Sequence, residues 1–362
     1  MQANESRQYF LYPLLLIKGI CILSVILLHV TSEFVRMNQS GWLTITLAFA
    51  NCLSRFAVPL FVMLSAFYLS LNPRNECAGS FYRRTLKFLV IPYFAYSLVY
   101  SIPTFLKNGD PLLIVPNLLT ASAADHLWFG LLIIQLYLLH PFLSRWYRAC
   151  KHRGVLLISA FSLQIASMSF SFALFRNPDL HTITGIAERL LSLLFVSNIG
   201  YFLAGYYLHE HSNDVIRLIR HKVSTYAGCV VWLATAVGLV VYWGIPMRQG
   251  ANLRNHLVLS SLTPILSFAA LTFIVPLFQN RNPDHTMSCR FLHSLGLYSH
   301  GVYYFHPLIF LLLRWTITHI LSVGRDTASF YWLYLLLFLP ATLMTLLSVR
   351  LMARLPLGRY VT

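Results

Sequence analysis

The sequence predicts an all-α protein, a polytopic bundle of about ten transmembrane helices with both termini on the cytoplasmic side. Three observations lead to this prediction. Hydrophobic residues make up 57% of the 362 residues and charged residues only 10%, whereas a soluble domain carries about 25% charge. The apolar residues gather in runs of membrane-spanning length, and the basic residues gather in short segments between those runs.

Ten apolar runs are each long enough for a membrane helix, which needs about 20 residues. No soluble domain or low-complexity linker separates them, so we expect residues 1–362 to form a single integral-membrane domain. The runs lie near residues 11–34, 46–71, 85–106, 126–143, 154–175, 186–208, 223–244, 257–279, 293–319 and 329–352.

The basic residues set the predicted orientation. If the N-terminus is cytoplasmic, the cytoplasmic segments carry 17 Lys and Arg residues and the opposite loops carry 6. Because cytoplasmic loops are the basic ones, this ratio predicts a multi-pass membrane protein with N-in, C-in topology. We expect its location to be the bacterial plasma membrane. We therefore attribute the net charge of +16 to topology and membrane lipid, and expect no nucleic-acid partner.

The first run, LYPLLLIKGICILSVILLHVTSEF, contains Lys18, His29 and Glu33. An ionisable residue in a membrane helix costs roughly 2.5–3.5 kcal/mol on insertion scales and so marks a candidate functional site. Lys18 and His29 fall on nearly the same helix face, roughly 16 Å apart along the axis, and Glu33 follows one turn later. The predicted orientation places Lys18 toward the cytoplasm and the other two toward the outside.

Other segments bring polar residues to the same outer level. Arg55 lies in the second run, and Asp125, His126 and Trp128 lie in ADHLWFG, which follows the third run. A histidine can take a proton from a hydroxyl, a carboxylate can orient it, and an arginine can stabilise an oxyanion. This set permits base-assisted acyl transfer, in which Arg55 and Trp128 would serve the acceptor or the oxyanion. The alternative for Trp128 is an aromatic anchor at the membrane interface.

The inner level is rich in cations. Lys18, Arg83 and Arg84 suit the phosphates of a nucleotide-type acyl donor. The alternative interpretation is structural, because arginines in cytoplasmic segments set topology and a lysine can extend its amine to the interface.

His306 and Ser65 are secondary candidates within apolar runs. The structural alternatives are that His306 caps carbonyls freed by Pro307 and that Ser65 packs helices. The chain has no metal-type spacing of His and Cys and no G-x-S-x-G, Walker or H-E-x-x-H motif. We therefore expect no metal and no permanently bound cofactor.

Several segments resemble acyltransferase family 3, the integral-membrane acyltransferases that modify carbohydrates. LLLIKGICILSVILLHV is similar to the family's first helix, whose signature is Arg, ten residues, then His; here Lys18 replaces the arginine and His29 is the histidine. RFAVPLFVMLSAFYL resembles the second-helix segment, with Ala66 where glycine is usual. The further matches follow in order over nearly the whole chain: FYRRTLKFLVIPYF, HLWFGLLIIQLYLLHPFL, NIGYFLAGYYL and SHGVYYFHPLIFLLL.

The resemblance implies a ten-helix enzyme that moves an acyl group, most simply acetyl, from cytoplasmic acyl-CoA to a sugar hydroxyl. The acceptor would be a surface polysaccharide or a lipid-linked glycan, and acyl-CoA would be a co-substrate. The family's essential first-helix pair falls on Lys18 and His29, its second-helix arginine on Arg55 and its third-loop histidine on His126. On this hypothesis His29 is the general base, and Glu33 or Asp125 orients it.

A second resemblance gives an alternative function. HVTSEF, SSLTPILSFAALTFIV and YYFHPLIF are also similar to the membrane protein of poly-N-acetylglucosamine biofilm loci, which has been described as an exporter. The alternative is therefore polysaccharide export or assembly without acyl transfer. A third possibility is a lineage that keeps the fold without catalysis.

Overall fold

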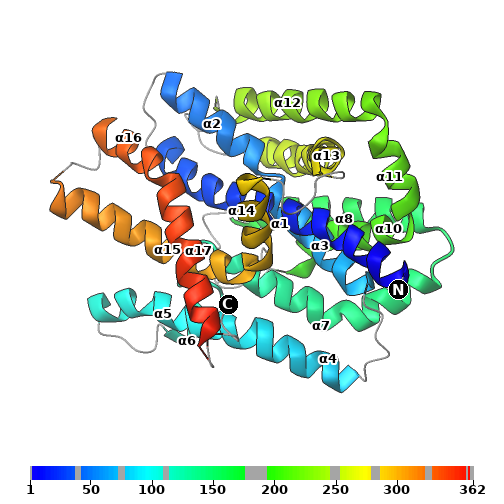
Figure 1. Ribbon diagram of the computed structural model, residues 1–362, viewed down its shortest axis with the longest axis horizontal. Helices are drawn as coiled ribbons and strands as arrows, with labels where there is room; N and C mark the ends of the chain where they lie inside the picture. Colours follow the sequence, from blue (N-terminus) through cyan, green and yellow to red (C-terminus); the bar gives the residue numbers. More distant parts are fainter. Residues whose placement is uncertain are drawn as a thin grey trace.

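The computed structural model describes residues 2–36, 42–71, 78–108, 114–175, 194–244, 253–278, 286–322, 328–355 and 358. Every regular element within these ranges is a helix, which confirms the all-α prediction (Figure 1). Six helical segments are long and apolar enough to cross a membrane, which confirms a multi-pass architecture: Pro13–Ser32, Ile45–Leu71, Ala78–Pro103, Leu127–Ala149, Arg153–Ser171 and Lys222–Val241. The number of ten spans and the N-in, C-in orientation stay predictions.

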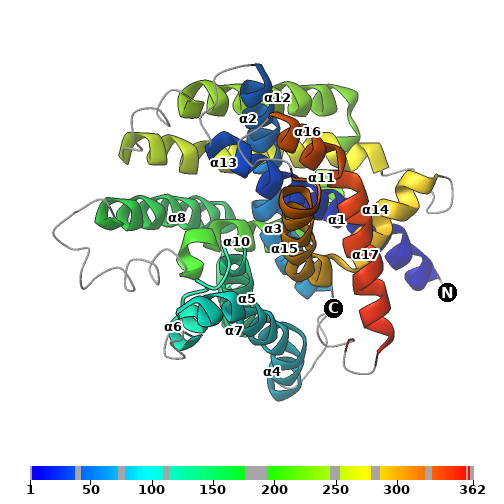
Figure 2. The same ribbon diagram turned by 90° about the vertical axis from the view of Figure 1, so that its left-hand side faces the viewer.

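Helix α1 (Gln2–Arg36) lies at the centre of the bundle in both views (Figures 1 and 2). It packs against α2 (Trp42–Ser54), α3 (Ala57–Leu71), α14 (Met287–Leu297) and α15 (Ser299–Trp315). An apolar sequence can be helical in lipid because a helix satisfies all of its backbone hydrogen bonds internally. The helix that carries the candidate residues is thus surrounded by protein along much of its length.

Three predicted spans are each broken into two helices. The second breaks at Arg55 and Phe56, between α2 and α3. Pro59 explains the position of this break, because a proline ring clashes with the carbonyl four residues earlier, which is that of Arg55. The ninth span breaks at Tyr298, between α14 and α15, and the tenth at Leu337, between α16 (Ala328–Leu336) and α17 (Phe338–Arg354).

The remaining helices surround this centre. Helices α12 and α13 pack side by side along one flank, and α10 packs against both α3 and α8 (Figures 1 and 2). The bounds of the remaining helices are α4 Ala78–Thr85, π-helix η1 Leu86–Val90, α5 Ile91–Asn108, α6 Ile114–Leu119, α7 Leu127–Ala149, α8 Arg153–Phe175, the 3₁₀ turn η4 Phe195–Asn198, α10 Ile199–Glu210, α11 Ser212–Arg220, α12 Lys222–Gly244, α13 Leu253–Phe278 and π-helix η6 Thr316–Ile320.

Glycines allow the central helices to approach closely. A Cβ on Gly19 of α1 would lie 2.0 Å from the carbonyl oxygen of Leu292, and one on Gly296 of α14 would lie 1.9 Å from that of Leu15. Small residues are the usual means of close helix packing in membranes. These two contacts hold α14, and hence the start of α15, directly against α1.

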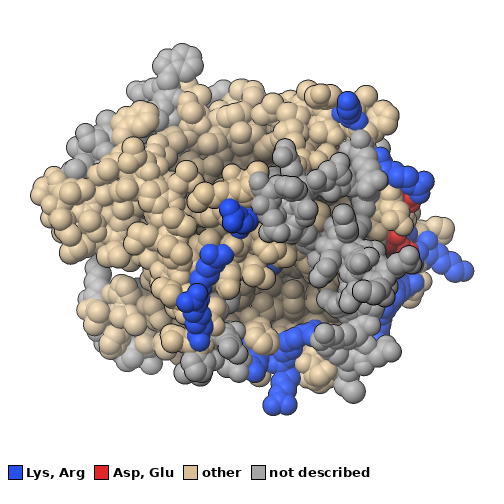
Figure 3. Space-filling model, viewed as in Figure 1, with Lys and Arg blue, Asp and Glu red and all other residues tan. Residues whose placement is uncertain are grey.

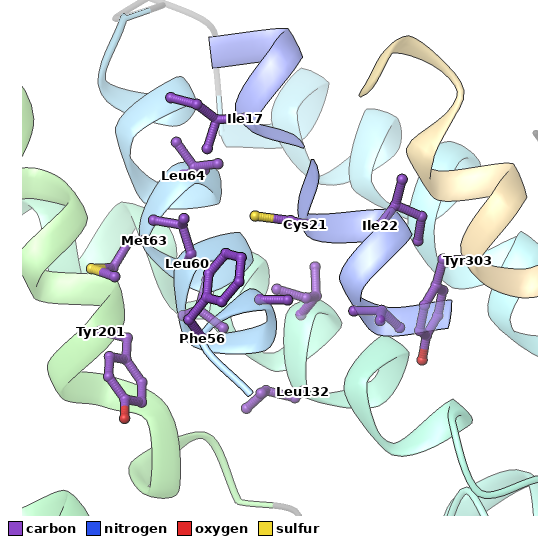
Figure 4. Close-up of a cluster of buried hydrophobic side chains, with 14 of the residues drawn as sticks. Ile17, Cys21, Ile22, Phe56, Leu60, Met63, Leu64, Leu132, Tyr201 and Tyr303 are labelled. Atoms are coloured by element: carbon purple, nitrogen blue, oxygen red, sulfur yellow. The ribbon is translucent and has the colours of Figure 1, made fainter. Parts of the chain in front are cut away.

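The core between α1, α3 and α10 is apolar. Figure 4 shows Leu60 and Leu64 of α3 near Ile17 and Cys21 of α1, with Met63 on the side that faces Tyr201 of α10. This packing fixes how α1 sits relative to the broken second span.

Basic side chains gather toward one end of the molecule on the face shown in Figure 3, whereas no Lys, Arg, Asp or Glu is visible at the opposite, left-hand end of that face. The end with the basic residues is that of α11 and α4, whose sequences contain Arg217, Arg83 and Arg84. The distribution of Lys and Arg residues along the sequence predicts that this is the cytoplasmic end.

Candidate functional site

Three histidines from distant parts of the chain meet in the interior. His29 comes from α1, His126 immediately precedes α7, and His306 comes from α15. Their ring centroids are 6.3 Å apart for His29 and His126, 5.5 Å for His29 and His306, and 5.7 Å for His126 and His306. The side chains of His126 and His306 are buried, at 3% and 1% exposed, while His29 is half-buried. We call these three residues the histidine cluster.

Tyrosines hold His126 in place. The hydroxyl of Tyr303 donates a hydrogen bond to the carbonyl oxygen of His126 and accepts one from the backbone N–H of Gly130 at 3.2 Å. The ring of Tyr100 meets the imidazole edge-on, with centroids 4.9 Å apart. The hydroxyl of Tyr100 donates to the carbonyl of Tyr304 at 2.8 Å. The start of α7 is therefore tied to α15 beside the histidine cluster.

His306 is held by its own helix. Its Nδ1 lies 3.0 Å from the carbonyl oxygen of Val302. Pro307 has no N–H, so it leaves the Tyr303 carbonyl without its helical donor, and that carbonyl also interacts with the His306 ring. The Nε2 atoms of His306 and His126 are both buried and have no hydrogen-bond partner. Two ring nitrogens at the cluster are therefore available to a substrate.

Arg55 lies at the break between α2 and α3 and is connected to α1 through Asn51. Arg55 donates from Nη2 to the Asn51 side-chain oxygen at 3.1 Å. The Asn51 amide nitrogen in turn donates to the Leu28 carbonyl at 3.1 Å and to the hydroxyls of Thr31 and Ser32, each at 3.0 Å. Because Leu28 directly precedes His29, this network fixes the guanidinium relative to the histidine-bearing turn.

The other predicted residues differ in their exposure and contacts. Asp125 is exposed, although its neighbour His126 is buried. Trp128 is half-buried and packs edge-on against Phe129, at 5.9 Å between centroids. Glu33 is in α1, and its side chain lies outside the described residues. Ser65 donates to the Phe61 carbonyl at 2.8 Å, as expected of a serine within a membrane helix.

A second group of polar side chains lies between α1 and α15 at the level of Lys18. The Lys18 ammonium lies 5.6 Å from the centroid of the Tyr68 ring. His300 of α15 is close enough for its charge to interact with that of Lys18. The Tyr68 hydroxyl and the His300 Nε2 are buried without a hydrogen-bond partner. Helix α15 therefore meets α1 at two levels, with His300 near Lys18 and His306 near His29.

The two predicted arginines of the inner level lie at the surface. Arg83 and Arg84 are exposed on α4, with the Arg84 guanidinium 5.8 Å from the centroid of the Phe81 ring. Their side chains are open to a ligand approaching from solvent.

Several residues that build the site were not predicted from the sequence. Asn51, Tyr68, Tyr100, His300 and Tyr303 were not predicted to contribute. Each is a polar side chain inside an apolar run, which is a signal in itself. That signal does not say which helices are neighbours.

No group of three or more His, Cys, Asp or Glu residues within the described ranges is arranged to hold a metal ion. The cluster offers proton transfer instead, because a neutral imidazole has one nitrogen that accepts a proton and one that donates. Arg55 adds a cation fixed near the same turn of α1.

The fold and the site together define a helical membrane protein in which three histidines from different helices meet in the interior. A comparison with protein families identifies the class further. The family described as an acyltransferase domain, acyltransferase family 3, matches residues 14–354, so the chain belongs to this family of membrane acyltransferases. No curated protein and no solved structure matches the chain.

Proposed function

We propose that the protein is a membrane O-acyltransferase that moves an acyl group, most simply acetyl, from cytoplasmic acyl-CoA to a sugar hydroxyl. The acceptor is a cell-surface polysaccharide or a lipid-linked glycan of a bacterial envelope. Family membership supports the reaction class. The observation that carries the site is the meeting of three imidazoles from α1, the start of α7 and α15.

In the proposed reaction His29 takes the proton of the acceptor hydroxyl while the hydroxyl oxygen attacks the thioester carbonyl carbon. The new C–O bond forms, the C–S bond breaks, and the proton passes to the departing thiolate, so the products are an O-acyl sugar and a free thiol. His126 assists in proton transfer. General acid–base catalysis of this kind contributes about 10²- to 10⁴-fold in rate.

Arg55 is proposed to stabilise the oxyanion or to position the acceptor. Its connection through Asn51 to the turn before His29 supports this role, because a donor stabilises a transition state best when its position is fixed beforehand. Trp128 is proposed as an acceptor platform beside the cluster.

The donor is proposed to approach from the Lys18 end. Lys18 is half-buried beside Tyr68 and His300, and Arg83 and Arg84 are exposed cations that suit the phosphates of acyl-CoA. The thioester would then reach the histidine cluster between α1 and α15.

The test uses purified full-length protein with acetyl-CoA labelled on the acetyl group and candidate glycans. We expect transfer of label by the wild type, and loss of at least about 100-fold in His29→Ala. The exposed His221 provides a control, His221→Ala, which should transfer at the wild-type rate. Equal transfer by His29→Ala would show that the site assignment is wrong.

Polysaccharide export is the competing function and gives a different result. Cells that lack an exporter accumulate polymer inside, and the acylation of that polymer is unchanged. Cells that lack a transferase export the polymer without its acyl groups.

A further inference from the structure

The tautomer of His306 can be assigned from its hydrogen bond. A backbone carbonyl only accepts hydrogen bonds, so the His306 Nδ1 that lies 3.0 Å from the Val302 oxygen carries the hydrogen. In a neutral ring the other nitrogen, Nε2, then has a free lone pair. This atom is buried and has no partner. His306 therefore presents a proton-accepting nitrogen of fixed position to the interior of the site.

Of the other two rings in the cluster, that of His306 lies closer to His29. The centroids of His29 and His306 are 5.5 Å apart, and those of His29 and His126 are 6.3 Å apart. A hydrogen bond of about 3 Å between nitrogens of two imidazoles places the ring centroids roughly 5 Å apart. The observed separation of the two centroids is therefore close to that of a hydrogen-bonded imidazole pair. Hydrogen bonds of catalytic groups are often long without substrate and shorten in the complex.

We propose that His306 is a positioning residue of the transfer reaction, whose Nε2 accepts a hydrogen bond from His29 and so orients it as general base. This inference rests on the proposed function and names the group that orients His29. The sequence predicted Glu33 or Asp125 for that task. Of these, Asp125 is exposed, whereas His306 is buried and contacts the His29 ring.

The physical reason is the cost of a buried charge. When His29 takes a proton it becomes an imidazolium in an apolar interior, which is expensive unless a hydrogen-bond acceptor is at hand. Nε2 of His306 supplies that acceptor and selects the His29 ring orientation in which the other nitrogen faces the hydroxyl. The carbonyls of Val302 and Tyr303 in turn keep the hydrogen of His306 on Nδ1.

Two substitutions separate this role from simple capping of carbonyls. Asparagine can still donate its amide hydrogen to the Val302 carbonyl but has no atom at the position of Nε2, whereas glutamine can place an amide oxygen near that position. We expect His306→Asn to lower kcat by about 100-fold, with the donor KM changed less than threefold. The kcat of His306→Gln should be at least about tenfold higher than that of His306→Asn.

A matched control is present in α7. His140 also precedes a proline in a helix, and its Nδ1 bonds the Tyr206 hydroxyl at 2.7 Å. His140→Asn should keep kcat within threefold of the wild type. Elution from size-exclusion chromatography and Tm establish that each variant is folded. Should His306→Asn fail to fold, His306→Ala replaces it, because alanine is the best helix former.

The outcomes are distinct. A folded His306→Asn with kcat within threefold of the wild type overturns the inference, because capping alone then suffices. A large loss in Glu33→Gln together with an active His306→Asn assigns the orienting role to Glu33 and overturns it as well. A wild type that transfers no label from any acyl-CoA overturns the proposed function itself, and this inference with it.

Discussion

The two polar levels between α1 and α15 are built from different groups. At the level of His29, three imidazoles meet. The backbone carbonyl of His126 accepts a hydrogen bond from Tyr303, and the ring of His306 donates one to the Val302 carbonyl. At the level of Lys18, a cation lies beside a tyrosine ring and a histidine. Imidazole rings suit proton transfer, whereas a cation suits an anionic ligand. In the proposed function, the level of His29 is the reaction end and the level of Lys18 is the binding end.

The largest effect that would test this comparison is expected at the reaction end. His126→Ala removes the imidazole but keeps the backbone carbonyl that accepts from Tyr303. We therefore expect a folded protein whose kcat falls by about 100-fold, with little change in donor KM. Steady-state kinetics with labelled acetyl-CoA measure both. A fall confined to KM would place His126 in donor binding instead.

The binding end should respond in KM. Lys18→Met keeps the apolar length of the side chain and removes the charge, so a hydrogen bond to a charged group is lost, which is worth about 1.5–3 kcal/mol, or roughly 10- to 100-fold in donor KM. Lys18→Arg retains the charge and should stay within about threefold of wild type. A Lys18→Met enzyme with normal KM and low kcat would show that Lys18 takes part in the reaction rather than in donor binding.

A smaller effect is expected from Tyr303, whose hydroxyl holds the backbone of His126 at the reaction end. Tyr303→Phe keeps the ring and removes the hydroxyl that bonds the His126 carbonyl and the Gly130 N–H. Loss of such a buried bond costs about 1–1.5 kcal/mol, which corresponds to roughly tenfold in kcat if the bond positions His126. The matched change is Tyr82→Phe, whose hydroxyl bonds an exposed carbonyl of Leu138, and it should have no effect on kcat. Equal kcat in both variants would exclude positioning by Tyr303.

The smallest effect is expected from the exposed arginines of α4. Arg83→Gln should raise donor KM by about fivefold or less, because a solvent-exposed ion pair contributes about 0–1 kcal/mol. Higher salt should reduce the difference from wild type, since exposed charges are screened. A change of tenfold or more would mean that Arg83 is buried against the donor when the donor binds.

Much of the fold could be predicted from the sequence, because the apolar runs of membrane helices are long and nearly free of charge. The breaks inside three of them were not predicted. A single proline, such as Pro59 in the first turn of α3, has little effect on the mean hydropathy of a twenty-residue window, so the hydropathy pattern does not reveal the break. Close packing at Gly19 and Gly296 was equally invisible, because it depends on which helices are neighbours.

The candidate site was predictable only in part. His29, His126 and Arg55 were each singled out, and their placement at one level was expected from topology. His306 was a secondary candidate because a histidine before proline has a ready structural explanation. The tertiary structure is consistent with both a capping role and a role in the site. One nitrogen of the His306 ring contacts the Val302 carbonyl, and the other has no hydrogen-bond partner and lies beside the cluster.

The sequence by itself determined the class of protein, the helix that carries the key residues and the spacing of Lys18 and His29 along it. These follow from composition and from the geometry of a single helix, which depend only on local order along the chain. Only the tertiary structure decided that α15 lies against α1, and that His306 meets His29. Contacts between helices depend on shape and close packing of residues far apart in the chain, and a single sequence does not record those pairings.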